Sequence, residues 1–486
     1  MLNSSFLDII RTFDKDEIKR FEAFLASPYF NTKNNVIQLF TYIRKYGPDF
    51  DNKLLDKEEL WKKLFSGKEY NYGVMKNVIY DITKLAERFL ENENFNSDTN
   101  QRTVNLLEKL TEKNLGNLFN SKYNSYEKNS LDSSKFYYTI YKDIWTLKNR
   151  KFYAEALNPK IRTKLFSSGI AKITILDFLA SFSFIYNSIY IERAEYNEFP
   201  ETEFISKFSD AIFSDTELEK YIEELSKGND KDIKLALIFF KQMKCYLNFD
   251  KIENYLELKK ALTENDKYIS EAALRGLYAC LGSALDICTD YNNIDKNKEL
   301  FEIFSKLIEK NIFTSEKGEV VPTLYMMAVK TSGYIKNPEF IEKLMKQFLP
   351  GIASDLKENL YLYSMTYLHY SKNEFDLALN YLNKINIDTF QMKYILRNLE
   401  VIISYEKNDP IAFTYLKDTH KHFLSKNKSV SERYKESNMK FLSYVNSLFK
   451  LREKFNITEK EFVLKDLMKD NVVNKIWLIE KFKEVT

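Results

Sequence analysis

A short phrase recurs three times in the second half of the chain and limits what the chain can fold into. The stretches YIKNPEF, YSKNEFD and YEKNDPI begin at Tyr334, Tyr370 and Tyr405, so they lie 36 and then 35 residues apart. Each reads Tyr-x-Lys-Asn and continues with a helix-start signal. A period of this length is typical of stacked helical hairpins. The phrase therefore predicts a helix that ends in tyrosine, a short polar turn and a second helix.

The residues after each tyrosine have the chemistry of a turn that starts a helix. Asparagine and aspartate side chains cap helix N-termini well, and proline is favoured at the first helical position. We expect the three caps to be Asn337 before Pro338, Asn373 with Asp376 at the third helical position, and Asp409 before Pro410. In this interpretation the Lys-Asn pair belongs to the turn, and the tyrosines are packing residues rather than binding residues.

Looser versions of the phrase extend the pattern toward the N-terminus, at Tyr246-Leu-Asn-Phe-Asp and Tyr291-Asn-Asn-Ile-Asp. They bring the prediction to about five hairpins. The predicted domains are an N-terminal helical module (1–95), a middle helical region (96–229), the hairpin repeats (230–425) and C-terminal helices that cap the array (426–486). A cap is expected because the last apolar face of a repeat stack needs a cover.

Composition and periodicity favour helices throughout. With 11 Gly and 8 Pro among 486 residues, the chain has too few turn-forming residues for an all-β protein of this length. The segment Ile173–Ile191 is strongly apolar and is expected to form a buried helix. The predicted fold class is all-α: a solenoid of helical hairpins with an N-terminal helical module and a C-terminal capping helix.

The hairpin region resembles the tetratricopeptide repeat family. The matching positions are Ala378 and Ala412, which are 34 residues apart where such repeats need a small residue, and the apolar Phe375, Leu382 and Ile385. The pattern departs from the family at Thr366 and Glu400, where the first helix usually has a small residue, and the proline that ends the motif is absent. The resemblance covers residues 230–425 and implies hairpins stacked side by side, without implying a particular partner.

The opening module has a second resemblance. It holds RFEAFLASPYFN and LFSGKEYN, and it is similar to the module that opens a group of bacterial helical proteins of comparable length with no assigned activity. Within it, Asp14 and Glu17 have the spacing of a capping box, which predicts a helix start. This resemblance implies a helical module and carries no function.

Charge is balanced overall but uneven along the chain. Lys plus Arg total 73 against 70 Asp plus Glu, which gives no general attraction to nucleic acid or membranes. Residues 142–172 hold eight basic and two acidic residues, residues 391–455 hold thirteen and seven, and residues 187–230 hold four and twelve. Basic residues interleaved with aromatic ones, as in the first block, can bind single-stranded nucleic acid. Alternatively, the aromatic residues face a core while the lysines are solvated, or the blocks mark a partner surface.

The sequence lacks the signatures of common catalytic and cofactor sites. No glycine-rich phosphate loop occurs. The histidines are His369, His420 and His422. The last two would point about 200° apart on a helix, so they cannot share a metal ion.

Two other groups have simple structural interpretations. Glu192, Glu195 and Glu198 recur every third residue and could hold a cation. Di-metal bundle sites pair such glutamates with a histidine, which is missing here, so a solvated acidic face is favoured. The cysteines Cys245, Cys280 and Cys288 lie in apolar contexts typical of small buried residues. We therefore predict no catalytic, cofactor-binding or metal-binding residues.

These features together predict a cytoplasmic protein without catalytic activity. Three cysteines are too few for a disulfide framework, and the polar start lacks a secretory signal. The expected function is a protein–protein interaction scaffold that presents the helices of residues 230–425 to a protein or peptide partner. The alternative is a nucleic-acid-binding or regulatory protein that uses the basic blocks 142–172 and 391–455.

Overall fold

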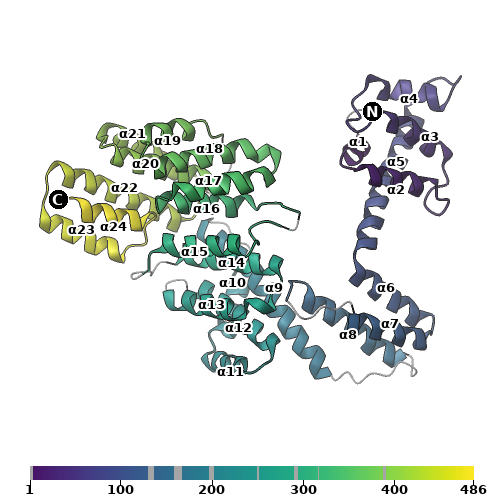
Figure 1. Cartoon of the computed structure of the whole chain (residues 1–486), viewed down its shortest axis with the longest axis horizontal. Helices are drawn as coiled ribbons and strands as arrows, with labels where there is room; N and C mark the ends of the chain where they lie inside the picture. The colour runs from purple at the N-terminus through teal and green to yellow at the C-terminus, as the bar shows by residue number, and fades with distance from the viewer. Residues whose placement is uncertain are drawn as a thin grey trace. The chain divides into compact units, whose positions relative to one another are not determined.

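The protein is all-α. A computed structural model describes residues 4–129, 136–157, 167–195, 202–248, 251–288, 294–315, 317–386, 390–428 and 430–486. Over these ranges it has 24 α-helices, a few short 3-10 turns and no β-structure beyond isolated bridges (Figure 1). The all-α class predicted from composition and periodicity is confirmed.

The chain divides into two compact units, residues 1–131 with 146–165, and residues 132–145 with 166–486. The first unit holds α1 (Ser5–Ile10), α2 (Lys15–Ala26), α3 (Asn34–Ile43), α4 (Lys57–Leu64), α5 (Tyr72–Ser97), α6 (Thr99–Glu112), α7 (Gly116–Asn129) and most of α8 (Ile140–Leu157). The second unit holds the first residues of α8 and then α9 (Ser167–Glu195), α10 (Thr202–Phe213), α11 (Thr216–Ser226), α12 (Lys231–Leu247), α13 (Ile252–Asn265), α14 (Glu271–Ile287), α15 (Lys296–Glu309), α16 (Pro322–Tyr334), α17 (Pro338–Phe348), α18 (Ser354–Ser371), α19 (Phe375–Leu382), α20 (Phe390–Glu406), α21 (Pro410–Lys426), α22 (Glu432–Glu453), α23 (Ile457–Lys469) and α24 (Lys475–Glu484).

Aromatic rings form the core of the opening module. Phe21 of α2 packs against Phe40 of α3, with ring centroids 5.0 Å apart, and against Phe89 of α5, at 5.3 Å. The helix α2 begins with the predicted capping box. The Asp14 carboxylate accepts from the Glu17 backbone N–H at 2.7 Å, and the Glu17 carboxylate accepts from the Asp14 N–H at 2.8 Å. This helix start is confirmed.

The three tyrosine phrases end their helices with one backbone geometry. In each turn one residue is left-handed: Lys336, Asn373 and Asn408 have φ of 57°, 60° and 54°. The next backbone N–H donates to a carbonyl five residues earlier, as in the Schellman motif: Asn337 to Ser332, Glu374 to His369, and Asp409 to Ser404. Asparagine tolerates the left-handed region better than most residues. This property lets a chain with only 11 Gly close its helices.

The caps after these turns agree with the sequence prediction in two of three cases. Asn337 accepts a hydrogen bond from a backbone N–H of α17, and Asp409 does the same for α21. The prediction for Asn373 is wrong. The helix α18 continues one residue past the tyrosine to Ser371, so Asn373 takes the left-handed position, and Glu374 precedes α19 without a side-chain cap.

The left-handed turn at Asn408 generates a stability prediction. Asn408→Ala should lower the free energy of unfolding by about 1 kcal/mol, because alanine has a Cβ atom that disfavours positive φ and lacks the polar side chain by which asparagine tolerates it. Asn408→Gly should leave it unchanged or slightly higher, because glycine has no such restriction. Urea denaturation followed by circular dichroism measures both. Equal effects of alanine and glycine would contradict the assigned geometry.

Tyrosine rings join α16 to α18. Tyr370 is fully buried and Tyr334 is half-buried. The Tyr334 ring lies 6.0 Å from the rings of both Tyr367 and Tyr370. Gly333 of α16 sits where a Cβ atom would come within 2.5 Å of the Tyr367 ring, so only glycine permits this close approach. The tyrosines of the phrase thus serve packing between helices.

Helices pack in sequence order between α12 and α22. The neighbouring pairs α12 and α13, α14 and α15, α16 and α17, α18 and α19, and α20 and α21 are each in contact. Further contacts join α12 to α14, α16 to α18, and α20 to α22. Near the C-terminus, the Trp477 indole of α24 donates to the Glu406 carboxylate at 2.9 Å and its ring lies 5.5 Å from that of Tyr405. The last helix therefore packs against the third tyrosine turn.

The apolar helix α9 is buried on one side only. It packs against α12 and α14, but Ile175 and Ile185 on its other side are 60% and 56% exposed. The expected burial of this segment therefore holds for one side of the helix, and the other side is exposed. Among the described residues, only the segment Ser167–Glu192 has the length and apolar composition of a membrane span. Core helices of globular proteins share both properties, so the segment by itself carries no membrane assignment.

Candidate functional site: a lysine enclosed by carboxylates

The three histidines have different local environments. The Nδ1 of His369 is hydrogen-bonded to the Glu374 carboxylate at 2.5 Å, and its ring stacks on Tyr381. Within α21, His420 is buried and His422 is exposed. These two side chains point to different sides of the helix, as their spacing predicts.

The other groups weighed from the sequence do not form a site among the described residues. Glu192 is exposed near the end of α9, whereas the side chain of Glu195 and the whole of Glu198 lie outside the described residues. Residues 158–166 of the first basic block also lie outside them. The three cysteines are buried thiols, and burial raises the pKa of Cys280 to about 11, which keeps it protonated and unreactive at neutral pH.

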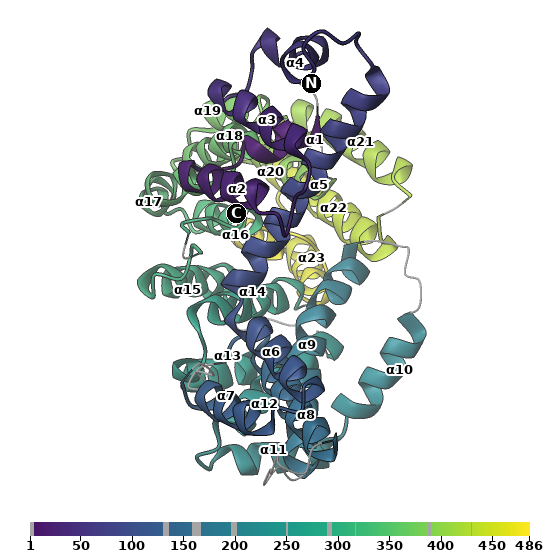
Figure 2. The same cartoon turned by 90° about the vertical axis from the view of Figure 1, so that its right-hand side faces the viewer.

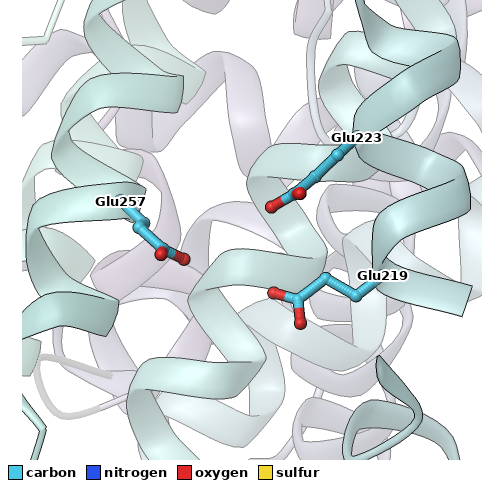
Figure 3. A group of neighbouring side chains, drawn as sticks. All are labelled: Glu219, Glu223 and Glu257. Atoms are coloured by element: carbon cyan, nitrogen blue, oxygen red, sulfur yellow. The ribbon is translucent and has the colours of Figure 1, made fainter. Parts of the chain in front are cut away.

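A cluster of carboxylates that the sequence did not single out lies in the second unit. Glu219 and Glu223 come from successive turns of α11, and Glu257 comes from α13. Figure 3 shows the three carboxylates converging on one point, and one oxygen from each lies within 4.8 Å of the others. Such spacing suits a bound cation. This group is therefore the candidate site.

A lysine of the protein itself supplies the cation. Lys241 of α12 donates from Nζ to Glu219 at 2.8 Å, to Glu257 at 2.6 Å and also to Glu223. A second lysine, Lys244, donates to the other carboxylate oxygen of Glu219. The helix α12 contacts both α11 and α13 (Figure 2). The arrangement is thus an ion-pair network that joins three helices, with an ammonium group where a metal ion would otherwise sit.

Burial and pairing act in opposite directions on the charges of this network. The side chains of Lys241 and Glu219 are only 5% and 11% exposed, whereas Glu223 and Glu257 are 43% and 51% exposed. Burial alone would raise the pKa of Glu219, but hydrogen bonds from Lys241 and Lys244 outweigh it and lower that pKa. Burial alone would lower the pKa of Lys241, but hydrogen bonds from the three glutamates outweigh it and raise that pKa. Both groups are therefore charged at neutral pH.

The local sequence explains how each partner is placed. Asp215 caps the N-terminus of α11, and its carboxylate accepts from the Leu218 N–H at 3.0 Å. On α12, Lys241 directly follows the apolar run LALIFF and projects from a helix that is buried around most of its circumference. A lysine at the end of such a run is the signal that sequence reasoning missed, because a buried lysine requires a partner of opposite charge.

Removing the central lysine tests the network. Lys241→Met should lower the free energy of unfolding by about 3 kcal/mol, because it leaves the buried Glu219 carboxylate with one cation fewer. The matched control is Lys207→Met on α10, whose ion pair with Glu203 has side chains 76% and 82% exposed. That pair is screened by water, so the control should change stability little. Equal losses in the two variants would contradict a buried network.

A buried histidine forms a second polar feature of the second unit. His420 is 1% exposed, and neither ring nitrogen has a hydrogen-bond partner among the described residues. Burial and the nearby Arg397 lower the pKa of His420 to about 4. The imidazole is therefore neutral when the protein is folded at physiological pH.

This histidine predicts a loss of stability in acid. In the unfolded chain His420 takes up a proton near pH 6.5, but in the folded chain it does so only near pH 4. The neutral His420 therefore contributes its full share of the folding stability above about pH 6.5, and this share is lost as the pH falls. Between pH 7.5 and 5, wild type should lose about 2 kcal/mol relative to His420→Leu. The control His422→Leu, at an exposed position, should track wild type. Parallel pH profiles for wild type and His420→Leu would contradict the lowered pKa.

Comparisons of the chain with models of protein families, with curated proteins and with solved structures found no match. The two resemblances noted in the sequence therefore stay predictions. Function has to be argued from the arrangement of this chain's own helices and surfaces.

Proposed function

We propose that the protein is a non-enzymatic interaction scaffold. In this proposal α12 to α21 form five helical hairpins of the tetratricopeptide type, stacked so that their helices offer an extended surface to a protein or peptide partner. The observation that carries the proposal is the shared geometry of the three tyrosine turns, each with a left-handed residue and the same backbone hydrogen bond. Similar turns within successive helix pairs are what a stack of repeats requires.

Packing between the pairs supports the same proposal. The contacts that join α12 to α14 and α16 to α18 link first helices of successive pairs, as expected for stacked hairpins, and α20 of the last pair contacts α22, the helix that follows the series. At one of these contacts Gly333 allows α16 to approach Tyr367 of α18 closely. Small residues at such positions are what the repeat family uses, although here the position is not one that the sequence pattern identified.

The surface of the series offers apolar anchors for a partner. Ile411 and Tyr415, one turn apart on α21, are 83% and 72% exposed, and Tyr361 on α18 is 41% exposed. Exposed tyrosines contribute contact area with little loss of side-chain entropy, which suits recognition of a protein. The buried titratable groups described above are enclosed by protein, which favours a structural role for them over chemistry on a substrate.

A nucleic-acid-binding function is the second candidate, and one observation favours it. On α8, within the basic block 142–172, Trp145, Phe152 and Tyr153 are 36%, 43% and 59% exposed. They are therefore available for base stacking beside the lysines of that helix. The second block, residues 391–455, supports it less. Several of its cations are engaged inside the protein: Arg452 donates to the Tyr405 carbonyl at 2.6 Å, and Lys440 pairs with Asp470 at 3.0 Å.

Purification of the tagged full-length protein from its own cells distinguishes the two functions. The scaffold proposal predicts a protein partner in near-stoichiometric amount by mass spectrometry, with an absorbance ratio at 260 and 280 nm typical of protein alone. It also predicts that the partner survives nuclease treatment.

Two outcomes would overturn the scaffold proposal. Co-purified nucleic acid that leaves steeply as salt is raised would instead support the basic block on α8. Turnover of a small molecule by the purified protein, lost with a substitution that leaves the fold intact, would show an enzyme.

A further inference from the structure

The helix α11 is turned with its apolar side toward solvent. Its only buried residue is Glu219, and the half-buried Glu223 lies beside it one turn later. Of its four apolar residues, Ile222 is half-buried, whereas Leu218, Tyr221 and Leu225 are 39%, 61% and 42% exposed. They follow the spacing i, i+3 and i+7, so they form one stripe along the helix. An amphipathic helix normally buries such a stripe, and α11 does the reverse.

The lysine network explains this orientation. Lys241 and Lys244 of α12 bond Glu219, and Lys241 also bonds Glu223, so the acidic side of α11 is drawn onto α12. Helical geometry then places the apolar stripe on the far side of α11. Turning the stripe inward would leave both lysines without these partners and would bury apolar side chains against charged groups. The exposed stripe is therefore a fixed feature of the fold.

Acidic side chains border this stripe. Glu217 and Glu224 are seven residues apart and form a row along one edge of it, and Asp215 precedes the helix. All three are exposed, and Glu217 pairs with the neighbouring Lys220 at 3.0 Å. A surface of this kind is complementary to an apolar stripe bordered by positive charge.

We propose that the exposed face of α11 binds a basic amphipathic helix of a partner protein. The partner's apolar residues would pack on Leu218, Tyr221 and Leu225, with Tyr221 as the central anchor. Its lysines or arginines would lie along Glu217 and Glu224. This inference rests on the proposed scaffold function and names the chemistry of one of its partners.

The charge of the surface selects this occupant over two others. An anionic membrane surface would be repelled by the acidic row, although it too can take up exposed apolar side chains. A second copy of the protein would bring an identical acidic row to the same interface, and like charges across an interface are unfavourable.

The probe for the test is a fluorescein-labelled synthetic helix of about 18 residues, long enough to be stable on binding, with leucines on one face and lysines elsewhere. A matched peptide carries glutamate in place of lysine. Fluorescence anisotropy with the full-length protein should show the lysine peptide binding at least about tenfold more tightly than the glutamate peptide. Leu218→Ser/Leu225→Ser should weaken the lysine peptide about tenfold, and Leu356→Ser, at an exposed position of α18, should not.

Charge reversal gives an independent readout. Glu217→Lys/Glu224→Lys keeps the apolar stripe and should invert the preference between the two peptides. Equal binding of the lysine peptide to wild type and to Leu218→Ser/Leu225→Ser would overturn the proposal, because charge alone would then explain binding. Two further results would overturn the proposal in favour of the other occupants. One is self-association in sedimentation velocity that is lost in Tyr221→Ala, and the other is binding to anionic phosphatidylserine vesicles through the same residues.

The failure of this inference can be told apart from failure of the scaffold proposal. The comparison uses full-length wild type and the full-length Leu218→Ser/Leu225→Ser variant, both shown to be folded by circular dichroism. If both retain the same stoichiometric protein partner from cells, and the lysine peptide binds both equally, α11 is not the binding surface. The scaffold function would then stand on another face of the second unit.

Discussion

The arrangement of α11, α12 and α13 depends on one buried ammonium group. Lys241 forms ion pairs with three carboxylates from two neighbouring helices, and its side chain is only 5% exposed. A charge in such a setting is tolerated only when its partners are held in place, because the cost of removing it from water is otherwise not recovered. Apolar packing tolerates small rotations of a helix, whereas this network fixes which side of α11 faces α12. The orientation of α11, and with it the exposure of its apolar stripe, follows from that constraint.

Elsewhere in the second unit, helices are joined by different means. Between α16 and α18 the contact is made by tyrosine rings and one glycine, and the turns that return the chain use left-handed asparagine or lysine. Aromatic contacts of this kind bury large areas without requiring charge partners. The two kinds of contact have different roles. The tyrosine phrases join neighbouring helices in sequence order, whereas the lysine network holds one helix with its apolar stripe outward.

The sequence predicted the features that depend on neighbouring residues. The helical class, the capping box at Asp14 and the caps at Asn337 and Asp409 follow from local chemistry and are confirmed. The cap expected at Asn373 failed because α18 extends one residue further than α16 relative to its tyrosine, a difference set by packing rather than by the phrase. The arrangement of the hairpins as a tetratricopeptide-like array stays a prediction.

The lysine network lay beyond sequence reasoning for a physical reason. Glu219, Lys241 and Glu257 belong to three helices. The residue spacing within one helix does not show which side of a neighbouring helix it packs against. The apolar composition of α9 indicated burial, but for the same reason it could not show that one side of the helix stays exposed. The charge surplus of residues 187–230 was visible in the sequence, but its pairing with an exposed apolar stripe required the fold.

Thiol labelling at position 221 measures the orientation of α11 most directly. The natural cysteines are buried, so a Tyr221→Cys variant carries one accessible thiol. If the lysine network holds α11 with its apolar stripe outward, this thiol should react with a maleimide within about tenfold of the rate for an unfolded peptide. Protection by more than about a hundredfold in the folded protein would mean that the stripe is buried. That result would contradict both the orientation of α11 and the surface inferred from it.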